Sequence, residues 1–180
     1  MTERPRSVFL IGMMGAGKTT VGRLLAQALG FDFVDADREL EARSGALIAT
    51  IFSVEGEEGF RRREAALLDE LTQRPGIVLA TGGGAVLNEE TRRRLHDRGL
   101  VLYLRANADE IHRRTRNDRS RPLLQTADPR ARIDELLMQR EPLYEQTAHI
   151  TFQSASANPR RLVRRLLDDP AVRQLVAAAP

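Results

Sequence analysis

The sequence contains no cysteine, which excludes disulfide bonds, thiolate metal ligands and a cysteine nucleophile. It also lacks any stretch approaching the roughly 18 consecutive apolar residues that a membrane-spanning helix needs. Residues 1–6 lead directly into an apolar strand, without the hydrophobic segment of a signal peptide. We therefore expect a cytoplasmic protein with no membrane partner.

Aromatic residues make up only 4% of the chain, and lysine occurs once, as Lys18. Every other basic residue is arginine, yet the formal net charge is only +3, because 25 acidic residues oppose 28 basic ones. A nucleic-acid-binding surface usually combines a strong excess of positive charge with aromatic side chains that stack on bases. We therefore expect no nucleic-acid partner.

The chain has an ordinary composition for a folded protein, with 180 residues, 42% of them hydrophobic and 29% charged. This length fits one domain spanning residues 1–180 and is sufficient to bury a core. We find no internal repeat and no linker that would divide it. The last residues, 171–180, are expected to form a frayed tail.

Short apolar runs alternate with stretches of helical spacing along the whole chain. The runs predict strands at residues 8–11, 31–34, 77–80, 100–104 and 149–152. The stretches between them predict helices at about 21–28, 37–72, 88–98, 108–116, 133–144 and 159–167. Because each strand is apolar throughout, the pattern predicts a parallel sheet covered on both faces, a three-layer α/β fold.

The segment Gly12–Thr19, GMMGAGKT, matches the phosphate-loop pattern G-x-x-x-x-G-K-[ST] and lies between an expected strand and an expected helix. Glycines in such a loop let backbone N–H groups face phosphate oxygens, and the helix dipole adds favourable potential. Lys18 would reach the β- and γ-phosphates, Thr19 would bind Mg²⁺, and Thr20 would contact the α-phosphate. A phosphate loop alone does not distinguish a kinase from a GTPase or a motor.

Two carboxylates, Asp35 and Asp37, follow the second strand, at the edge where open α/β sheets bind ligands. One could hold water bound to Mg²⁺ while the other accepts the proton of an attacking hydroxyl. Alternatively, Asp37 merely caps a helix that begins at Arg38. Thr81–Gly84 follows the third strand, and its three glycines could expose N–H groups to an anion or form only a tight turn.

Three arginine-containing segments, Phe60–Glu64, Arg119–Leu124 and Gln139–Tyr144, could each be surface charge when taken alone. In Phe60–Glu64 only some of the arginines can face one way, so most are expected to be solvated. The second segment lies in a stretch without helical pattern, at about residues 117–127, which is long enough to be a mobile lid.

Taken together and in this order, the motifs resemble those of the shikimate kinase family over about residues 7–168. The motifs are GMMGAGKTT, Asp35-Ala36-Asp37, Phe60-Arg61-Arg62, Thr81–Val86, Arg121–Leu124, Arg140–Tyr144 and Asn158-Pro159. The resemblance implies a small monomeric P-loop kinase with a five-stranded parallel sheet, similar to nucleoside monophosphate kinases. It also implies that ATP and Mg²⁺ are required and that the γ-phosphate passes to the 3-hydroxyl of shikimate.

The resemblance further implies a role for each matching residue. ATP would be bound by Gly15, Ala16, Gly17, Lys18, Thr19, Thr20, Arg114, Arg121, Asn158 and Pro159. Shikimate would be bound by Asp37, Arg61, Gly82, Gly83 and Arg140, with Glu64 bracing the arginines. Lys18, Asp37 and Arg121 would be catalytic, whereas Thr19 and, through water, Asp35 would hold Mg²⁺. Ala157 departs from the polar or basic residue that often precedes Asn-Pro in this family.

Two other kinds of function stay open at this point. One is another small-metabolite kinase of the same fold, such as a gluconate kinase or a nucleoside monophosphate kinase. The other is a nucleotide-dependent regulatory or nucleic-acid-binding switch. Arg61 with Arg140 favours an acidic acceptor, because two arginines would be left unpaired beside a neutral polyol.

Overall fold

The computed structural model describes residues 7–154 and 158–177, and the side chains of residues up to 174. Expectations for Met1–Arg6, for Ala157 and for residues 178–180 lie outside the described residues. Five strands form one parallel sheet in the order β2-β3-β1-β4-β5. They are β1 (Ser7–Ile11), β2 (Asp32–Asp35), β3 (Ile77–Ala80), β4 (Gly99–Arg105) and β5 (Ile150–Gln153). The predicted fold class is confirmed.

The central strands are apolar because both of their faces are covered. Every residue of β1 and β3 is buried, and Phe9 of β1 pairs with Leu79 on one side and Val101 on the other. All strands run the same way, so their carboxyl ends meet at one edge of the sheet. The loops after β1, β2 and β3 therefore lie close together.

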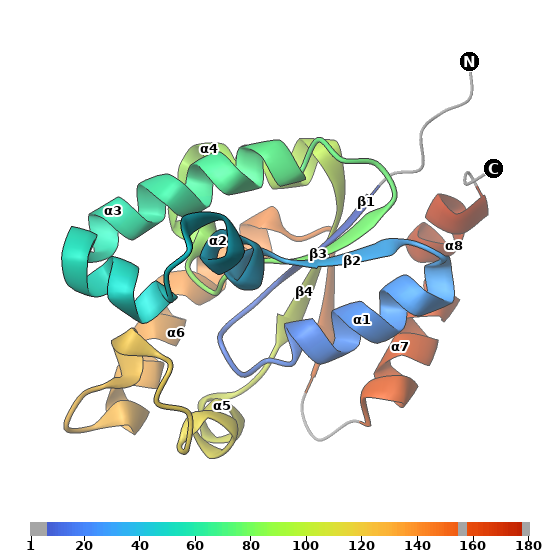
Figure 1. The fold of residues 1–180 in the computed structure, drawn as a ribbon. Coiled ribbons are helices and arrows are strands. Elements are labelled where there is room, and N and C mark those ends of the chain that lie inside the picture. The colour runs from blue at the N-terminus through green and yellow to red at the C-terminus, as the bar shows by residue number, and fades with distance from the viewer. Residues whose placement is uncertain (1–6, 155–157, 178–180) are drawn as a thin grey trace.

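Helices cover the two faces of the sheet in three layers (Figure 1). The helices are α1 (Lys18–Leu29), α2 (Ala36–Ser44), α3 (Ile48–Leu71), α4 (Glu89–Arg98), α5 (Ala108–Thr115), α6 (Pro129–Thr147), α7 (Pro159–Asp168) and α8 (Pro170–Ala177). Two 3-10 turns, η1 (Ala85–Leu87) and η2 (Pro122–Leu124), add to these. Figure 1 shows α1, α7 and α8 on one side of the sheet and α3 and α4 on the other.

The single helix expected over residues 37–72 is wrong, because the structure has two helices, α2 and α3, in this region. Gly45 adopts φ 66° and ends α2, a left-handed conformation that favours glycine. Helix α3 is itself kinked at Gly56, whose φ of 71° and ψ of 179° lie in a region essentially restricted to glycine. The helical spacing of apolar residues over 37–72 does not indicate where the helix is interrupted at these two glycines.

The frayed tail expected over residues 171–180 is also wrong for its first part, which forms α8. Asp169 caps this helix, since its Oδ1 accepts a hydrogen bond of 2.9 Å from the amide of Ala171. Pro170 occupies the first helical position, where its missing N–H has no cost. Val172 is fully buried, so α8 adds to the core.

The segment expected to be free of helix, residues 117–127, contains only η2. Asp118 organises its first part by accepting hydrogen bonds from the amide and hydroxyl of Ser120. Leu124 is buried and attaches the segment to the core. In Figure 1 this yellow segment runs between α5 and α6.

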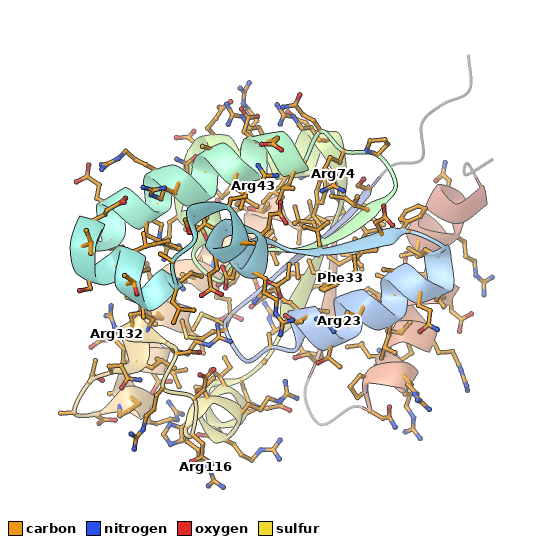
Figure 2. All side chains as sticks on the ribbon, viewed as in Figure 1. Arg23, Phe33, Arg43, Arg74, Arg116 and Arg132 are labelled. Carbon is orange, nitrogen blue, oxygen red and sulfur yellow. The ribbon has the colours of Figure 1, made fainter. Side chains whose placement is uncertain are left out.

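Most of the arginines lie on the outside of the molecule (Figure 2). Arg74 and Arg116 are exposed, and the guanidinium of Arg23 lies 5.5 Å from the centroid of the Phe33 ring. In the described part of the chain, no helix is long and apolar enough to cross a membrane.

The packing of α8 predicts a difference between two neighbouring substitutions. Val172→Ala should lower the free energy of unfolding by about 2 kcal/mol, because it removes buried methyl groups and leaves a cavity. Gln174→Ala, on the exposed face of the same helix, should change it by less than about 0.5 kcal/mol. Urea denaturation measures both. Equal effects would show that α8 does not contribute to the core.

Candidate active site

The phosphate loop between β1 and α1 has the backbone that its sequence predicts. Gly12, Gly15 and Gly17 have φ values of 142°, 75° and 95°, which a residue with a side chain rarely adopts. A Cβ at Gly12 would lie 2.5 Å from the carbonyl oxygen of Leu104 in β4. The amide of Ala16 donates to the carbonyl of Met13 within the loop. Close contact with β4 therefore requires glycine at the start of this loop.

Lys18 lies under the loop with only 8% of its surface exposed. Its Nζ donates hydrogen bonds of 2.7 and 2.8 Å to the carbonyl oxygens of Gly12 and Met13. Burial lowers the pKa of Lys18 to about 8, although the neighbouring Asp37 opposes this shift. The ammonium is thus held beside the loop, and no carboxylate of the described residues contacts it directly, so an incoming anion can pair with it.

Thr19 and Asp35 lie side by side at the start of α1 and the end of β2. The Thr19 hydroxyl donates a hydrogen bond of 2.7 Å to Oδ2 of Asp35. A hydroxyl and a carboxylate are hard oxygen donors of the kind that Mg²⁺ prefers. This pair fits the predicted metal position.

Asp35, and not Asp37, caps the helix that follows β2. Oδ1 of Asp35 accepts hydrogen bonds from the amides of Asp37 and Arg38, and α2 begins at Ala36. The alternative that Asp37 is merely a cap is therefore wrong. Its carboxylate instead lines the cleft, where burial and then the nearby Asp35 raise its pKa.

Each glycine of Thr81–Gly84 lets a different group approach the backbone. A Cβ at Gly82 would collide with Oε1 of Glu64 and lie 3.0 Å from Oδ1 of Asp37. A Cβ at Gly83 would lie 3.2 Å from the amide nitrogen of Met14, and one at Gly84 would overlap the guanidinium of Arg61. A side chain at any of the three positions would crowd or displace a neighbouring group, which a simple tight turn does not explain.

One arginine of the Phe60–Glu64 run faces inward, as the sequence predicts. The side chain of Arg61 is 19% exposed, and its Nη1 lies 2.6 Å from Oε2 of Glu64. Arg62 and Arg63 are more exposed and pair with Glu58 and Glu55. Glu64 itself is buried, and this burial raises its pKa.

Arg140 is the most buried arginine of the described chain, with 1% of its surface exposed. Its Nε and Nη1 have no hydrogen-bond partner among the described residues, and it forms no ion pair with them. Burial lowers the pKa of Arg140, and the nearby Arg61 adds to this effect. An unpaired buried guanidinium is costly, so this position favours an anionic ligand.

Two adjoining hollows contain these groups. A cleft of about 440 Å³ is lined by the phosphate loop with Asp35, Asp37 and Arg114. A smaller pocket of about 70 Å³ is lined by Arg61, Glu64, Arg140 and the three glycines. Asp37, Gly83 and Arg121 line both hollows, so they lie where the two meet.

The other residues predicted to bind the nucleotide do not all lie at the cleft. Arg114 lies beside the loop, where its Nη1 donates a hydrogen bond of 2.9 Å to the Gly15 carbonyl and its Nη2 contacts Glu110. Nε of Arg121 is paired with Asp118 at 2.9 Å. Asn158 caps α7 through the amide of Arg160, and neither it nor Pro159 lines the cleft formed by the described residues. Ala16 is buried and does not line it either.

Several residues of the two hollows lie outside every motif identified in the sequence. They are Arg38, Glu41, Ile48 and Phe52. The spacing of Ile48 and Phe52, four residues apart, is an ordinary helical pattern that indicates burial and not a ligand. Tyr144, whose hydroxyl donates a hydrogen bond of 2.5 Å to the Gly83 carbonyl, belongs to the Arg140–Tyr144 motif, but no role of its own was predicted for it.

The lowered pKa of Lys18 predicts a pH dependence for nucleotide binding. Below pH about 8 the amine is charged and pairs with phosphate, and above it the free protein holds a neutral amine. The dissociation constant of ATP should therefore rise with pH, approaching about tenfold per pH unit well above this pKa.

Calorimetric titrations from about pH 7 to about pH 9 measure this effect. Lys18→Arg, which keeps its charge, should lack the pH dependence. A flat profile for the unaltered protein would contradict the assignment of Lys18 to the phosphates.

Comparisons with known proteins agree with this geometry. The family model for shikimate kinase matches residues 14–170. Shikimate kinase of Bordetella avium (strain 197N) is 57% identical over 160 residues, which are 89% of this chain and 77% of that protein. Shikimate kinase of Nitrosospira multiformis is 58% identical over 160 residues, 89% of this chain and 82% of that protein.

Among solved structures, shikimate kinase from Acinetobacter baumannii in complex with shikimate is 46% identical. It matches with a TM-score of 0.89 and covers 91% of both chains. These matches decide between the enzymes left open by the sequence, because they favour shikimate kinase over gluconate kinase and nucleoside monophosphate kinase. The chain belongs to the shikimate kinase family.

Proposed function

We propose that the site described above transfers the γ-phosphoryl group of ATP to the 3-hydroxyl of shikimate. As a member of its family, the chain is an ATP-dependent shikimate kinase of aromatic biosynthesis. One observation carries the assignment of the site: the buried, unpaired guanidinium of Arg140 lies in a pocket that adjoins the phosphate loop. That pocket suits a small acid whose hydroxyl must face the nucleotide.

The nucleotide binds in the larger cleft. Amides of the phosphate loop, from Gly15 to Thr20, and the ammonium of Lys18 would hold the phosphates. Arg114, next to Gly15, would lie against the nucleotide beyond its phosphates. Asn158 and Pro159 remain proposed contacts to adenine on the strength of the family resemblance.

The acceptor binds in the smaller pocket. Arg61 and Arg140 would hold its carboxylate, helped by the backbone of Gly82 and Gly83. Glu64 fixes the guanidinium of Arg61 through their 2.6 Å ion pair. The remaining hydroxyls of the acceptor would face Asp37, which lines both hollows.

Mg²⁺ would be held by the hydroxyl of Thr19 and, through water, by Asp35. The 2.7 Å hydrogen bond between these two side chains supports the proposal, because it places two oxygen donors together at the phosphate loop. When bound, the ion neutralises charge on the β- and γ-phosphates.

The catalytic residues act by position and charge. Asp37 would accept the proton of the acceptor hydroxyl, and its raised pKa suits a base that works near neutral pH. Lys18 and Arg121 would stabilise negative charge on the transferring phosphoryl group. Arg121 lies where the cleft and the pocket meet, which supports this role.

Residues 117–127 would act as a lid that brings Arg121 onto the phosphates. Ser120 and Arg121 line both hollows, so movement of this segment would open or close them together. Slower proteolytic cleavage of the segment in the presence of ATP and shikimate is the expected sign of closure.

We also propose that the chain works as a single domain and a monomer in the cytoplasm, without a membrane or nucleic-acid partner. The balanced charge and few aromatic residues of the sequence support the absence of a nucleic-acid partner. Sedimentation at micromolar concentration tests the monomer.

The role of Asp37 predicts that Asp37→Asn separates chemistry from nucleotide binding. The kcat should fall by at least about a hundredfold, the usual scale of general base assistance, while ATP affinity changes little. Asp32→Asn, at the exposed start of β2, the strand that precedes the helix of Asp37, is the matched control and should leave both unchanged. Loss of ATP affinity with unchanged turnover of bound ATP would assign Asp37 to the metal instead.

The role of Arg61 predicts that its contribution depends on the negative charge of the acceptor. Arg61→Ala should raise the KM for shikimate about tenfold and leave the KM for ATP unchanged, because charge-assisted hydrogen bonds of this kind are worth roughly 1.5–3 kcal/mol. The same substitution should cost much less with shikimate methyl ester, which lacks that charge.

A cycle of two enzymes and two substrates, measured as kcat/KM, isolates this coupling. Arg62→Ala removes the adjacent arginine, whose side chain is 68% exposed and paired with Glu58, and it should have no effect. If the penalties of substitution and esterification simply add, Arg61 does not contact the carboxylate.

A further inference from the structure

Tyr144 of α6 is fully buried behind the acceptor pocket. Its hydroxyl donates a hydrogen bond of 2.5 Å to the carbonyl oxygen of Gly83, 61 residues earlier in the chain. Its ring stacks on Tyr103 of β4, with centroids 4.9 Å apart and an interplanar angle of 28°. The hydroxyl is thus held in place by the packing of the ring.

This hydrogen bond has a particular place in the triple-glycine turn. The carbonyls of Gly82 and Gly84 accept hydrogen bonds from the amides of Ala85 and Leu87, within the 3-10 turn that follows. The carbonyl of Gly83, between them, accepts from the side chain of Tyr144. Consecutive glycines have wide conformational freedom, and no hydrogen bond within the turn holds the Gly83 carbonyl. The bond from Tyr144 therefore fixes the orientation of this peptide.

The same tyrosine also lies next to the acceptor arginine. Arg140 precedes Tyr144 by four residues on α6, so both side chains lie on one face of the helix. A side-chain hydrogen bond with Tyr144 favours the charged form of Arg140. Burial raises the pKa of the Tyr144 phenol, so it remains protonated and able to donate throughout the neutral range.

Gly83 lines both proposed ligand sites. A Cβ at this position would lie 3.2 Å from the amide of Met14 in the phosphate loop and 3.5 Å from Nη1 of Arg140. Gly83 thus lies between the phosphate loop and the arginine, where a side chain would crowd the loop. The hydroxyl of Tyr144 is bonded to the carbonyl of this residue.

We propose that Tyr144 is a positioning residue for acceptor binding, which holds the Gly83 peptide and the Arg140 guanidinium in the arrangement that receives a carboxylate. This inference rests on the acceptor site proposed above. It assigns Tyr144 no contact with either substrate. Its effect reaches the acceptor through Gly83 and Arg140.

The test removes only the hydroxyl. Tyr144→Phe keeps the buried ring and its stacking on Tyr103, and should raise the KM for shikimate by about tenfold, since two buried polar groups lose a partner. The kcat and the KM for ATP should stay within about twofold of their original values. Tyr103→Phe is the matched control, because Tyr103 is equally buried in the same stack and its hydroxyl does not bond Gly83 or Arg140; its shikimate KM should not change.

A second substrate separates positioning from general loosening. With shikimate methyl ester the effect of Tyr144→Phe should largely disappear, since the ester carries no charge for Arg140 to bind. An unchanged shikimate KM, an equal penalty on both substrates, or an equal rise in the ATP KM would overturn the inference.

Substitution of the two arginines distinguishes failure of the acceptor site from failure of the role of Tyr144. If Arg61→Ala and Arg140→Ala also leave the shikimate KM unchanged, the acceptor site itself is elsewhere. If they raise it and Tyr144→Phe does not, the acceptor site stands and only the role of Tyr144 is overturned. Thermal denaturation of each variant identifies any that fails to fold.

Discussion

Close packing of backbone against backbone sets the distance between the phosphate loop and the acceptor pocket. Gly83 lies so near Met14 that a single Cβ would come within 3.2 Å of its amide. Phosphoryl transfer is carried largely by positioning, because the attacking and leaving oxygens must be in line. A separation fixed by two main chains is more rigid than one fixed by side chains, since side chains can change rotamer. The separation of the two loops thus follows from the register of β1 and β3, which carry them.

The electrostatics of the site depend on the same closeness. Four ionisable side chains lie together in this region, and burial favours the neutral form of each. It lowers the pKa of Lys18 and Arg140 and raises the pKa of Asp37 and Glu64. Removing charges from water without full pairing is unfavourable, so the site is stabilised by the rest of the fold. Two anionic ligands would complete the pairing, one beside Lys18 and one beside Arg140. The affinity for these anionic ligands would therefore come from positive charge that is incompletely paired in the free protein.

The sequence was sufficient for the sheet, because fully covered parallel strands are apolar throughout and the runs at β1, β3 and β4 show this directly. It also located the phosphate loop, whose glycines and lysine have a fixed spacing. It could not reveal the break at Gly45 or the helix α8, since both depend on local caps and on packing against distant residues. Nor could residue type and spacing tell which arginine is buried: only the family resemblance singled out Arg140, and its burial depends on the tertiary fold. Asp35 is an example of what the sequence could not predict, because one of its oxygens caps a helix while the other accepts a hydrogen bond from Thr19.

The solitary lysine has a consequence for chemistry on the intact protein. Lys18 carries the one side-chain amine in a chain whose other cationic residues are all arginine, and its pKa of about 8 leaves a larger neutral fraction at physiological pH than an exposed lysine has. Neutral amines attack acylating and aldehyde reagents, so the reaction of these reagents with side-chain amines is confined to one atom. That atom lies at the nucleotide cleft. Labelling of this side chain, followed separately from that of the backbone amino group, therefore reports occupancy of the phosphate loop without any engineered tag.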